Sequence, residues 1–243
     1  MFNLVADTTK CRPHSSFTRI RFWLCTLTVI AWTLTACAQR PTPTLEASLM
    51  DKSLLTDKPC PAPCWYGLEL GKSTRAEVLA TLQTLSFADP KTIQEAGSNY
   101  WDYTADKNLP ATLIRIDCRR PNRPYPQCAA LRVSNDILVD IILSPNYALP
   151  LSEVVDHLGP PDYVGAVILQ DLTTCQLMLM WIKKQIQLER TEVNGKNLCE
   201  AVRAGQRLDP SLTVDAIYYM LPQWFARLPE EGRDRPWAGL ARP

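Results

Sequence analysis

Histidine is nearly absent from this 243-residue chain, which has only His14 and His157. Catalytic dyads and triads that activate a serine or cysteine commonly use a histidine as the general base. His14 lies in a segment that we expect to be removed. His157 falls in the last turn of a predicted helix, off its apolar stripe, where the helix dipole stabilises an imidazolium. We therefore predict no catalytic residue and a protein that is not an enzyme.

Glycine and concentrated charge are also scarce. The chain has nine glycines against 20 prolines, and its formal net charge is +1. It contains no glycine-rich loop that could cradle a phosphate. It also lacks the basic surplus that is typical of proteins that bind nucleic acids. We expect no cofactor and no nucleic-acid partner.

The stretch from Phe22 to Cys37, FWLCTLTVIAWTLTAC, resembles a bacterial lipoprotein signal. Arg19 and Arg21 precede it, and its apolar core is shorter than the roughly 20 residues that span a bilayer. It ends in the letters LTAC, which are similar to a lipobox. The resemblance implies that residues 1–36 are a signal peptide and that Cys37 carries the lipid, palmitate included. An ordinary signal peptide or an uncleaved anchor remains the alternative.

A lipid on Cys37 would decide where the protein acts. Two or three acyl chains hold a protein on a membrane durably, whereas one chain binds weakly and reversibly. The residue after the cysteine is Ala38, so the aspartate that resembles an inner-membrane retention signal is absent. We expect an extracytoplasmic lipoprotein on the outer membrane or outer cell face. Its partners would be the membrane and another envelope protein.

Six cysteines remain after the signal peptide and Cys37 are set aside. An even number of cysteines in an exported chain favours disulfides. A metal site is the main rival, but the cysteines have no histidine near them, and we expect no metal. Sequence alone does not fix the pairing. Proximity favours the pairs Cys60 with Cys64, Cys118 with Cys128, and Cys175 with Cys199.

Patterns of apolar residues predict an α+β fold of two tandem units, each with one short helix followed by about four antiparallel strands. Thr74 and Glu77 stand in capping-box register at the start of the first helix. The turn Asn135-Asp136 predicts a hairpin between Ala129–Ser134 and Ile137–Leu143. In the first unit we also expect strands at Asn99–Ala105 and Ala111–Asp117. In the latter, the alternation of Leu113, Arg115 and Asp117 with Thr112, Ile114 and Ile116 leaves one face wet. In the second unit we expect strands at Tyr163–Leu169, Cys175–Ile182, Gln185–Thr191 and Val214–Leu221. The predicted segments are a tether at 37–58, the two units at 59–145 and 146–228, and a disordered tail at 229–243.

Two short runs resemble known families. Gly71–Val78, and more closely Ser152–Pro161, are similar to the helix of the BamE (SmpA/OmlA) lipoproteins and of the beta-lactamase-inhibitor-protein-like folds. That resemblance implies short helices on one face of a small antiparallel sheet and action by protein contact. The block Pro63–Gly67, PCWYG, is similar to exported bacterial proteins with a PCWxG motif. Neither resemblance assigns a functional residue.

Three groups of side chains are candidates for surface roles. Aromatic residues could form a recognition surface or pack in the core. A basic cluster near Tyr125 could contact anionic glycan or lipid, or be a solvated loop. Scattered aspartates could pair for glycoside hydrolysis. These groups are, in order, Trp65, Tyr66, Tyr100, Trp101 and Tyr103; Arg115, Arg119, Arg120 and Arg123; and Asp102, Asp106, Asp117 and Asp140.

The leading hypothesis is a membrane-anchored, non-enzymatic module that binds a protein or an envelope component. The alternatives are an envelope-polymer hydrolase and a structural spacer without a ligand. A deep pocket lined by two acids, or by His157 and a nucleophile, would favour the hydrolase. A shallow sheet face that carries aromatic residues would favour the binding module.

Overall fold

The computed structural model describes residues 49–102, 106–119, 126–225, 234–235 and 237–241. All of these lie in the compact unit that runs from Leu45 to Pro243. Cys37 and the predicted signal peptide lie outside the described residues, as do Tyr103, Arg120, Arg123 and Tyr125.

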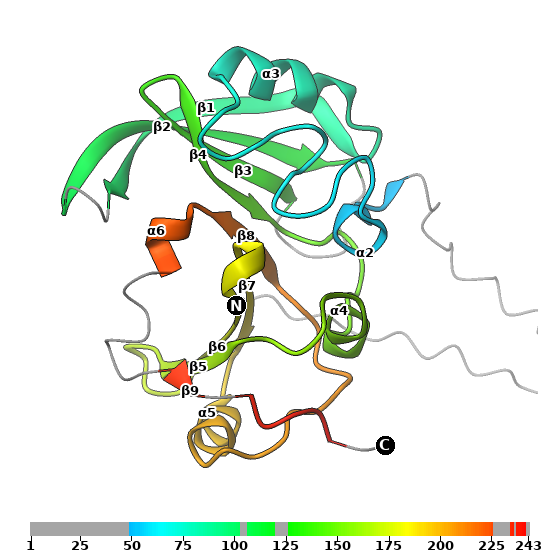
Figure 1. Cartoon of the computed structure of the whole chain (residues 1–243), viewed down its shortest axis with the longest axis vertical. Helices are drawn as coiled ribbons and strands as arrows, with labels where there is room; N and C mark the ends of the chain where they lie inside the picture. The colour runs from blue at the N-terminus through cyan, green and yellow to red at the C-terminus, as the bar shows by residue number, and fades with distance from the viewer. Residues whose placement is uncertain (1–48, 103–105, 120–125, 226–233, 236, 242–243) are drawn as a thin grey trace, which may run out of the picture. The chain divides into compact units, whose positions relative to one another are not determined.

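A single antiparallel sheet of nine strands organises this unit, in the order β1-β2-β3-β4-β8-β7-β6-β5-β9 (Figure 1). The prediction of two tandem helix-plus-sheet units is wrong. The cause is the pairing of β4 with β8, from Asp140 opposite Met220 to Leu143 opposite Ile217, which joins all strands into one sheet. The strands are β1 (Ala88–Asp102), β2 (Lys107–Cys118), β3 (Gln127–Ser134), β4 (Ile137–Leu143), β5 (Tyr163–Ile168), β6 (Cys175–Trp181), β7 (Ile186–Glu192), β8 (Ala216–Met220) and β9 (Asp234–Arg235).

Most helices cover one face of the sheet. Buried residues of α3, α4 and α5 share a core with strand residues such as Ile114, Leu131 and Leu188. In contrast, α6 packs with Met180 and Met220, whose side chains lie on the opposite face. Figure 1 shows α4 and α6 on opposite sides of β7 and β8. The helices are α2 (Ser53–Thr56), α3 (Arg75–Thr84), α4 (Leu151–Leu158), the 3-10 turn η2 (Ile182–Lys184), α5 (Lys196–Arg203) and α6 (Pro222–Phe225).

Several local predictions are confirmed. The Thr74 side chain and Glu77 form the capping box of α3. β3 and β4 form the predicted hairpin, and Asn135 and Asp136 in its turn have φ values of 50° and 64°. Positive φ at both turn residues is what a tight two-residue hairpin needs. β5, β6 and β7 begin within one residue of their predicted starts.

β1 is the strand that the sequence placed least well, because it begins at Ala88 and not near Asn99. It is an edge strand, so few of its side chains are buried and they show no apolar alternation. Its pairing with β2 is also interrupted between Asp89 and Gln94 by a bulge. An edge position and a bulge both remove the period-2 signal from which a strand is predicted.

Three disulfides confirm the pairing that proximity favoured: Cys60–Cys64, Cys118–Cys128 and Cys175–Cys199. The last of these fixes α5 to β6, and both of its cysteines are fully buried. Cys118–Cys128 joins the end of β2 to the start of β3. Cys60–Cys64 and Cys118–Cys128 therefore each hold the ends of a short connecting segment together, whereas Cys175–Cys199 fixes a helix to the sheet.

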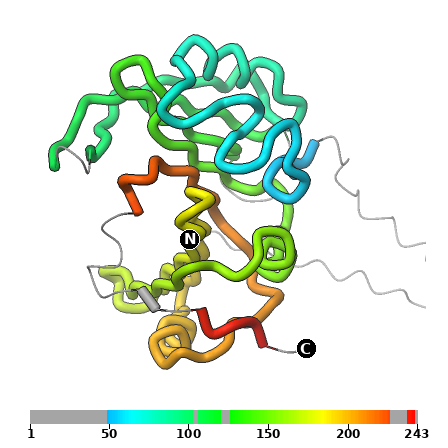
Figure 2. The backbone as a smooth tube through the Cα atoms, in the orientation of Figure 1, coloured from blue at the N-terminus to red at the C-terminus, as the bar shows by residue number. Residues whose placement is uncertain are grey.

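The folded region begins earlier than the predicted tether of 37–58 allows. The carboxylate of Asp51 accepts hydrogen bonds from Trp65 Nε1 at 2.9 Å and from the Ser53 amide at 3.1 Å. The Asp51 amide donates to Asn146 Oδ1 at 3.3 Å. The backbone trace in Figure 2 shows this blue segment beside α4, where Asp57 Oδ1 lies 3.2 Å from His157 Nε2. Residues 49–58 are thus part of the fold.

The predicted disordered tail of 229–243 is also corrected for the part that the structure describes. Trp237 and Leu240 pack against the main core. Leu208 donates from its amide to Gly239, and Ala241 donates to Leu208. β9 adds two residues to the edge of β5. The apolar side chains of this segment find partners that its charged and proline-rich sequence did not indicate.

Within the described ranges, no helix combines the length and the apolar character that crossing a membrane requires.

The contacts of Asp51 generate a stability prediction. Trp65 is fully buried, so replacing Asp51 by Ala leaves a buried indole N–H without its acceptor. We expect Asp51→Ala to lower the free energy of unfolding by about 1–3 kcal/mol. Urea unfolding with the disulfides intact measures the change. Asp156→Ala, at an exposed position of α4, is the matched control and should have little effect. Equal unfolding midpoints for the two variants would contradict the role of Asp51.

Candidate functional site

The predicted aromatic surface is divided in the structure. Trp65 is fully buried and its ring centroid lies 5.3 Å from that of Tyr66, while both rings contact Phe87 just before β1. Tyr100 is buried and Trp101 is exposed, and both lie near the other end of β1. Trp65 and Tyr66 therefore belong to the packing of the N-terminal region, and the described aromatics do not form one surface.

Of the residues that a hydrolase could use, His157, Asp117 and Asp140 are separated. His157 contacts Asp57 at the outer side of α4. Asp140 is bonded to Arg132, which lies opposite it on β3. Arg132 also lies opposite Leu113 of β2, and Asp117 lies four residues further along β2 than Leu113. At about 3.3 Å per residue, Asp117 is therefore about 13 Å from Asp140 along the strand direction. The two carboxylates of a glycosidase are only roughly 5–9.5 Å apart.

A different candidate is the second face of the sheet, which we define as the face opposite α3, α4 and α5. Directly paired residues of neighbouring strands point to the same face. One row on this face crosses seven strands. It contains, in order, Arg115, Ala130, Ile142, Tyr218, Gln187, Met180 and Tyr163. The polar end of this row is at β2, and its apolar end lies near α6.

A cleft of about 470 Å³ lies at the polar end of the second face. We call it the polar cleft. Its lining comes from the bulge of β1, the end of β2, the start of β3 and the residue after β4. The sheet brings these segments side by side. The lining residues are Thr92, Gln94, Arg115, Asp117, Pro126, Gln127 and Ser144.

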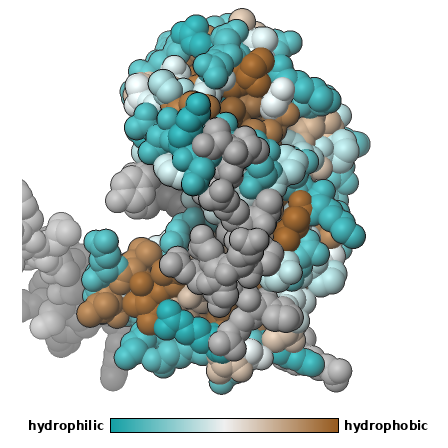
Figure 3. Space-filling model, turned by 60° about the vertical axis from the view of Figure 1, so that its left-hand side comes forward, coloured by the Kyte–Doolittle hydropathy of each residue, from teal (hydrophilic) through white to brown (hydrophobic). Residues whose placement is uncertain are grey.

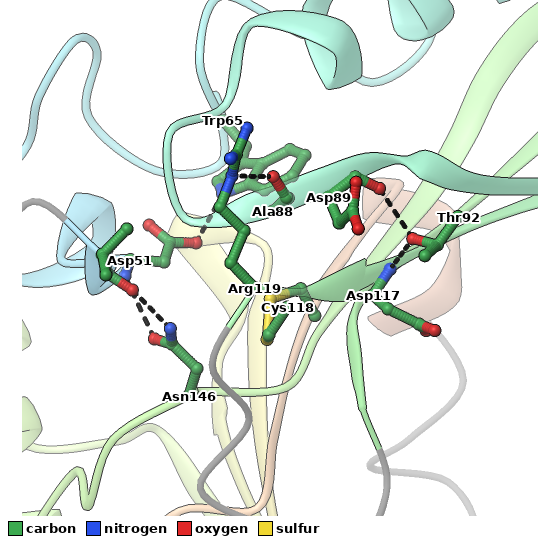
Figure 4. Close-up of a disulfide and its surroundings, with 11 residues drawn as sticks. Asp51, Trp65, Ala88, Asp89, Thr92, Asp117, Cys118, Arg119 and Asn146 are labelled. Carbon is green, nitrogen blue, oxygen red and sulfur yellow. Dashed lines mark hydrogen bonds between the residues drawn. A yellow bond between two sulfur atoms is a disulfide. The ribbon is translucent and has the colours of Figure 1, made fainter.

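Two structural elements hold the walls of the polar cleft. The Thr92 hydroxyl accepts a hydrogen bond from the Asp117 amide at 2.9 Å and donates to the Asp89 carbonyl at 2.7 Å, which ties the bulge of β1 to β2. The Cys118–Cys128 disulfide joins β2 to β3 beside it. Figure 4 shows both, with the Asp117 carboxylate directed away from Thr92. The cleft is therefore built on fixed backbone.

Most polar side chains that line the cleft have no partner within the described ranges. No hydrogen bond or ion pair engages the Arg115 guanidinium, the Asp117 carboxylate, or the amides of Gln94 and Gln127 in this part of the chain. Several charged side chains elsewhere are paired, as in Arg75 with Glu95, Arg132 with Asp140 and Arg190 with Asp215. The cleft thus gathers uncommitted hydrogen-bonding groups.

The centre of the second face carries a buried polar group. Asp140 is 7% exposed and forms an ion pair with Arg132. Burial raises the pKa of Asp140 to about 6, although the Arg132 charge and its hydrogen bonds act in the opposite direction. Burial and the Glu189 carboxylate, to which Tyr218 donates a hydrogen bond, raise the pKa of Tyr218. Because of Arg132, Asp140 and Tyr218, the second face is more polar beside the polar cleft than near α6.

Figure 3 shows a brown patch in the lower part of the described surface and smaller brown patches above it, among hydrophilic residues. Among the described residues the large exposed apolar side chains are Trp101, Leu172 and Val193, which come from separate segments. These three side chains do not form one exposed apolar cluster along the chain. The polar cleft is the better candidate for recognition.

The basic cluster is only partly placed. Arg115 lines the polar cleft. Arg119 is tied to the backbone, because its Nε donates to the Ala88 carbonyl and its amide donates to the Phe87 carbonyl, at 2.8 and 2.9 Å. The cluster therefore contributes one uncommitted cation to the cleft in the part of the chain that the structure describes.

Of the residues that line the cleft, the sequence predicts Arg115 and Asp117 as candidates but not Gln94, Gln127 and Ser144. The alternation in β2 indicated one wet face, and Arg115 and Asp117 lie on it, as expected. Gln94 follows a bulge and Ser144 follows a strand end, so neither stands in a periodic pattern that marks its direction. Their convergence depends on the sheet.

Comparison of the chain with models of protein families, with curated proteins and with solved structures gave no match.

The raised pKa of Asp140 generates a prediction on pH. Its folded pKa lies above the unfolded one, so the folded state holds the proton more tightly. The stability from this group is present below about pH 4 and is lost as the pH rises to about 6, by up to about 3 kcal/mol. Asp140→Asn has no such titration, although it leaves Arg132 without its anion at every pH.

We therefore expect the free energy of unfolding of Asp140→Asn, relative to the natural protein, to rise between pH 4 and pH 6.5. Urea unfolding at several pH values measures this difference and cancels the titration of carboxylates common to both proteins. A difference that stays constant across the range would show that Asp140 titrates normally in the fold.

Proposed function

We propose that the protein is an extracytoplasmic lipoprotein, anchored to a bacterial membrane through Cys37, that binds an envelope component in its polar cleft without catalysis. The support for the compartment comes from the lipobox-like LTAC and from three disulfides, since disulfides persist in oxidising compartments.

The observation that carries the binding role is the set of uncommitted polar groups on a fixed wall. Arg115, Asp117, Gln94 and Gln127 point into one cleft and find no partner among the described residues. Groups that are already held in place need little further ordering when a ligand binds, so less binding free energy is lost. The Thr92 hydrogen bonds and the Cys118–Cys128 disulfide supply that order.

The anchor is tested by labelling. Cells that express the full chain with an alkyne analogue of palmitate should label the protein, and its mature N-terminus should be Cys37. Cys37→Ala should abolish the label. Cys25→Ala, a cysteine inside the predicted signal peptide, is the control and should leave the label unchanged. A label that survives Cys37→Ala, or a mature chain that still carries residues 1–36, would refute the proposed anchor.

Binding is tested with the insoluble envelope polymer. The full-length lipoprotein, solubilised in detergent, should sediment with purified peptidoglycan sacculi. Arg115→Glu reverses the free cation of the cleft and should weaken this binding about tenfold, in line with about 1–3 kcal/mol for a lost charged hydrogen bond. Arg203→Glu makes the same charge change at an exposed site on α5 and should bind as before. Equal sedimentation of both variants would remove the cleft from the binding role.

A further inference from the structure

We propose that the ligand of the polar cleft is a neutral saccharide segment of an envelope glycan, and this inference rests on the proposed function. The first argument is the balance of charge. Among the described residues, Arg115 and Asp117 are the two charged ones that line the cleft, and their charges cancel. A ligand with a strong net charge of either sign would meet a like charge, so an uncharged ligand is favoured.

The second argument is the balance of donors and acceptors. The guanidinium of Arg115 only donates, the carboxylate of Asp117 only accepts, and the amides of Gln94 and Gln127 do both. A sugar hydroxyl also donates and accepts. Neighbouring hydroxyls of one ring can therefore satisfy the carboxylate and the guanidinium together, which an aliphatic or purely anionic ligand does not.

The register of the sheet places these groups in a compact array. Gln94 lies opposite Arg115 on β1 and β2, and Gln127 lies opposite Asp117 on β2 and β3. Arg115 and Asp117 are two residues apart on the same face of β2, at a spacing of about 7 Å. Each charged side chain thus has a glutamine amide beside it. Together the four side chains extend further than two neighbouring hydroxyls of one sugar. A ring with several hydroxyls is the ligand that matches it.

The third argument is size. A volume of about 470 Å³ lies within the range of roughly 300–1,000 Å³ that is usual for sites of small organic ligands. It leaves room for more than one six-membered ring, and it exceeds what a single amino acid fills. The carbon stems of the glutamines and the ring of Pro126 offer apolar contact for the C–H face of a sugar. A segment about two sugar units long therefore fits the cleft.

The experiment uses the full-length lipoprotein in a polyoxyethylene detergent, because detergents with sugar headgroups would compete. N,N′-diacetylchitobiose, cellobiose and maltose are added separately, and binding is followed by saturation-transfer difference NMR and titration. We expect at least one disaccharide to bind. Asp117→Asn, which preserves shape and removes the charged acceptor, and Gln127→Ala should each weaken binding about tenfold.

The matched control is Gln83→Ala, at an exposed position of α3, which should bind as the natural protein does. Circular dichroism and unfolding midpoints establish that each variant is folded. Disaccharide binding that is equal in Asp117→Asn, Gln127→Ala and Gln83→Ala would overturn the inference, because the sugar would then bind elsewhere.

The remaining outcomes separate this inference from the proposed function. If no disaccharide binds but sedimentation with sacculi still depends on Arg115, the saccharide inference is wrong and the envelope-binding role stands. Binding of the zwitterionic dipeptide glycylglycine in place of the sugars, lost in Asp117→Asn, would assign the cleft to peptide and also overturn the inference. If sedimentation and sugar binding both fail, both proposals fall.

Discussion

The pairing of β4 with β8 is the contact on which the architecture depends. It joins strands that are about 80 residues apart in the sequence into one sheet, so the two parts of the chain share a single core. Ile141 and Leu143 of β4 lie opposite Tyr219 and Ile217 of β8 on the helix-bearing side. Without this seam each part would leave a long edge strand exposed, which natural proteins avoid.

The same seam creates the second face. It aligns residues from β2 to β5 into continuous rows, and it places Asp140 and Tyr218 at the centre, between the polar cleft and the apolar cluster under α6. Burial of the Arg132–Asp140 pair at this point is costly in free energy. The sheet is thus divided into an apolar part that α6 covers and a polar part that remains accessible.

The polar cleft shows how disulfides can serve a site as well as stability. Cys118–Cys128 constrains the end of β2 and the start of β3, and the hydroxyl of Thr92 holds the bulge of β1 against them. The side chains of Arg115 and Asp117 and the neighbouring glutamine amides take no part in these contacts. A cleft whose backbone is fixed and whose side chains are uncommitted is suited to recognition.

The amino-acid sequence by itself determined the features that depend on neighbours along the chain. These are the capping box of α3, the β3–β4 hairpin and the pairing of Cys60 with Cys64 and of Cys118 with Cys128 across short loops. Each involves residues close in sequence, whose encounter requires little loop closure. The polar face of β2 could also be predicted, because polar and apolar side chains alternate along this strand.

Only the tertiary structure decided the rest. Asp51 meets Asn146 across 95 residues, and β4 meets β8 across a similar separation. Nothing in the local pattern of either segment names its partner, because apolar strands pair with many others equally well. The cleft has the same origin: Gln94, Arg115, Gln127 and Ser144 come from four segments, and each reads as an ordinary surface residue until the sheet brings them together.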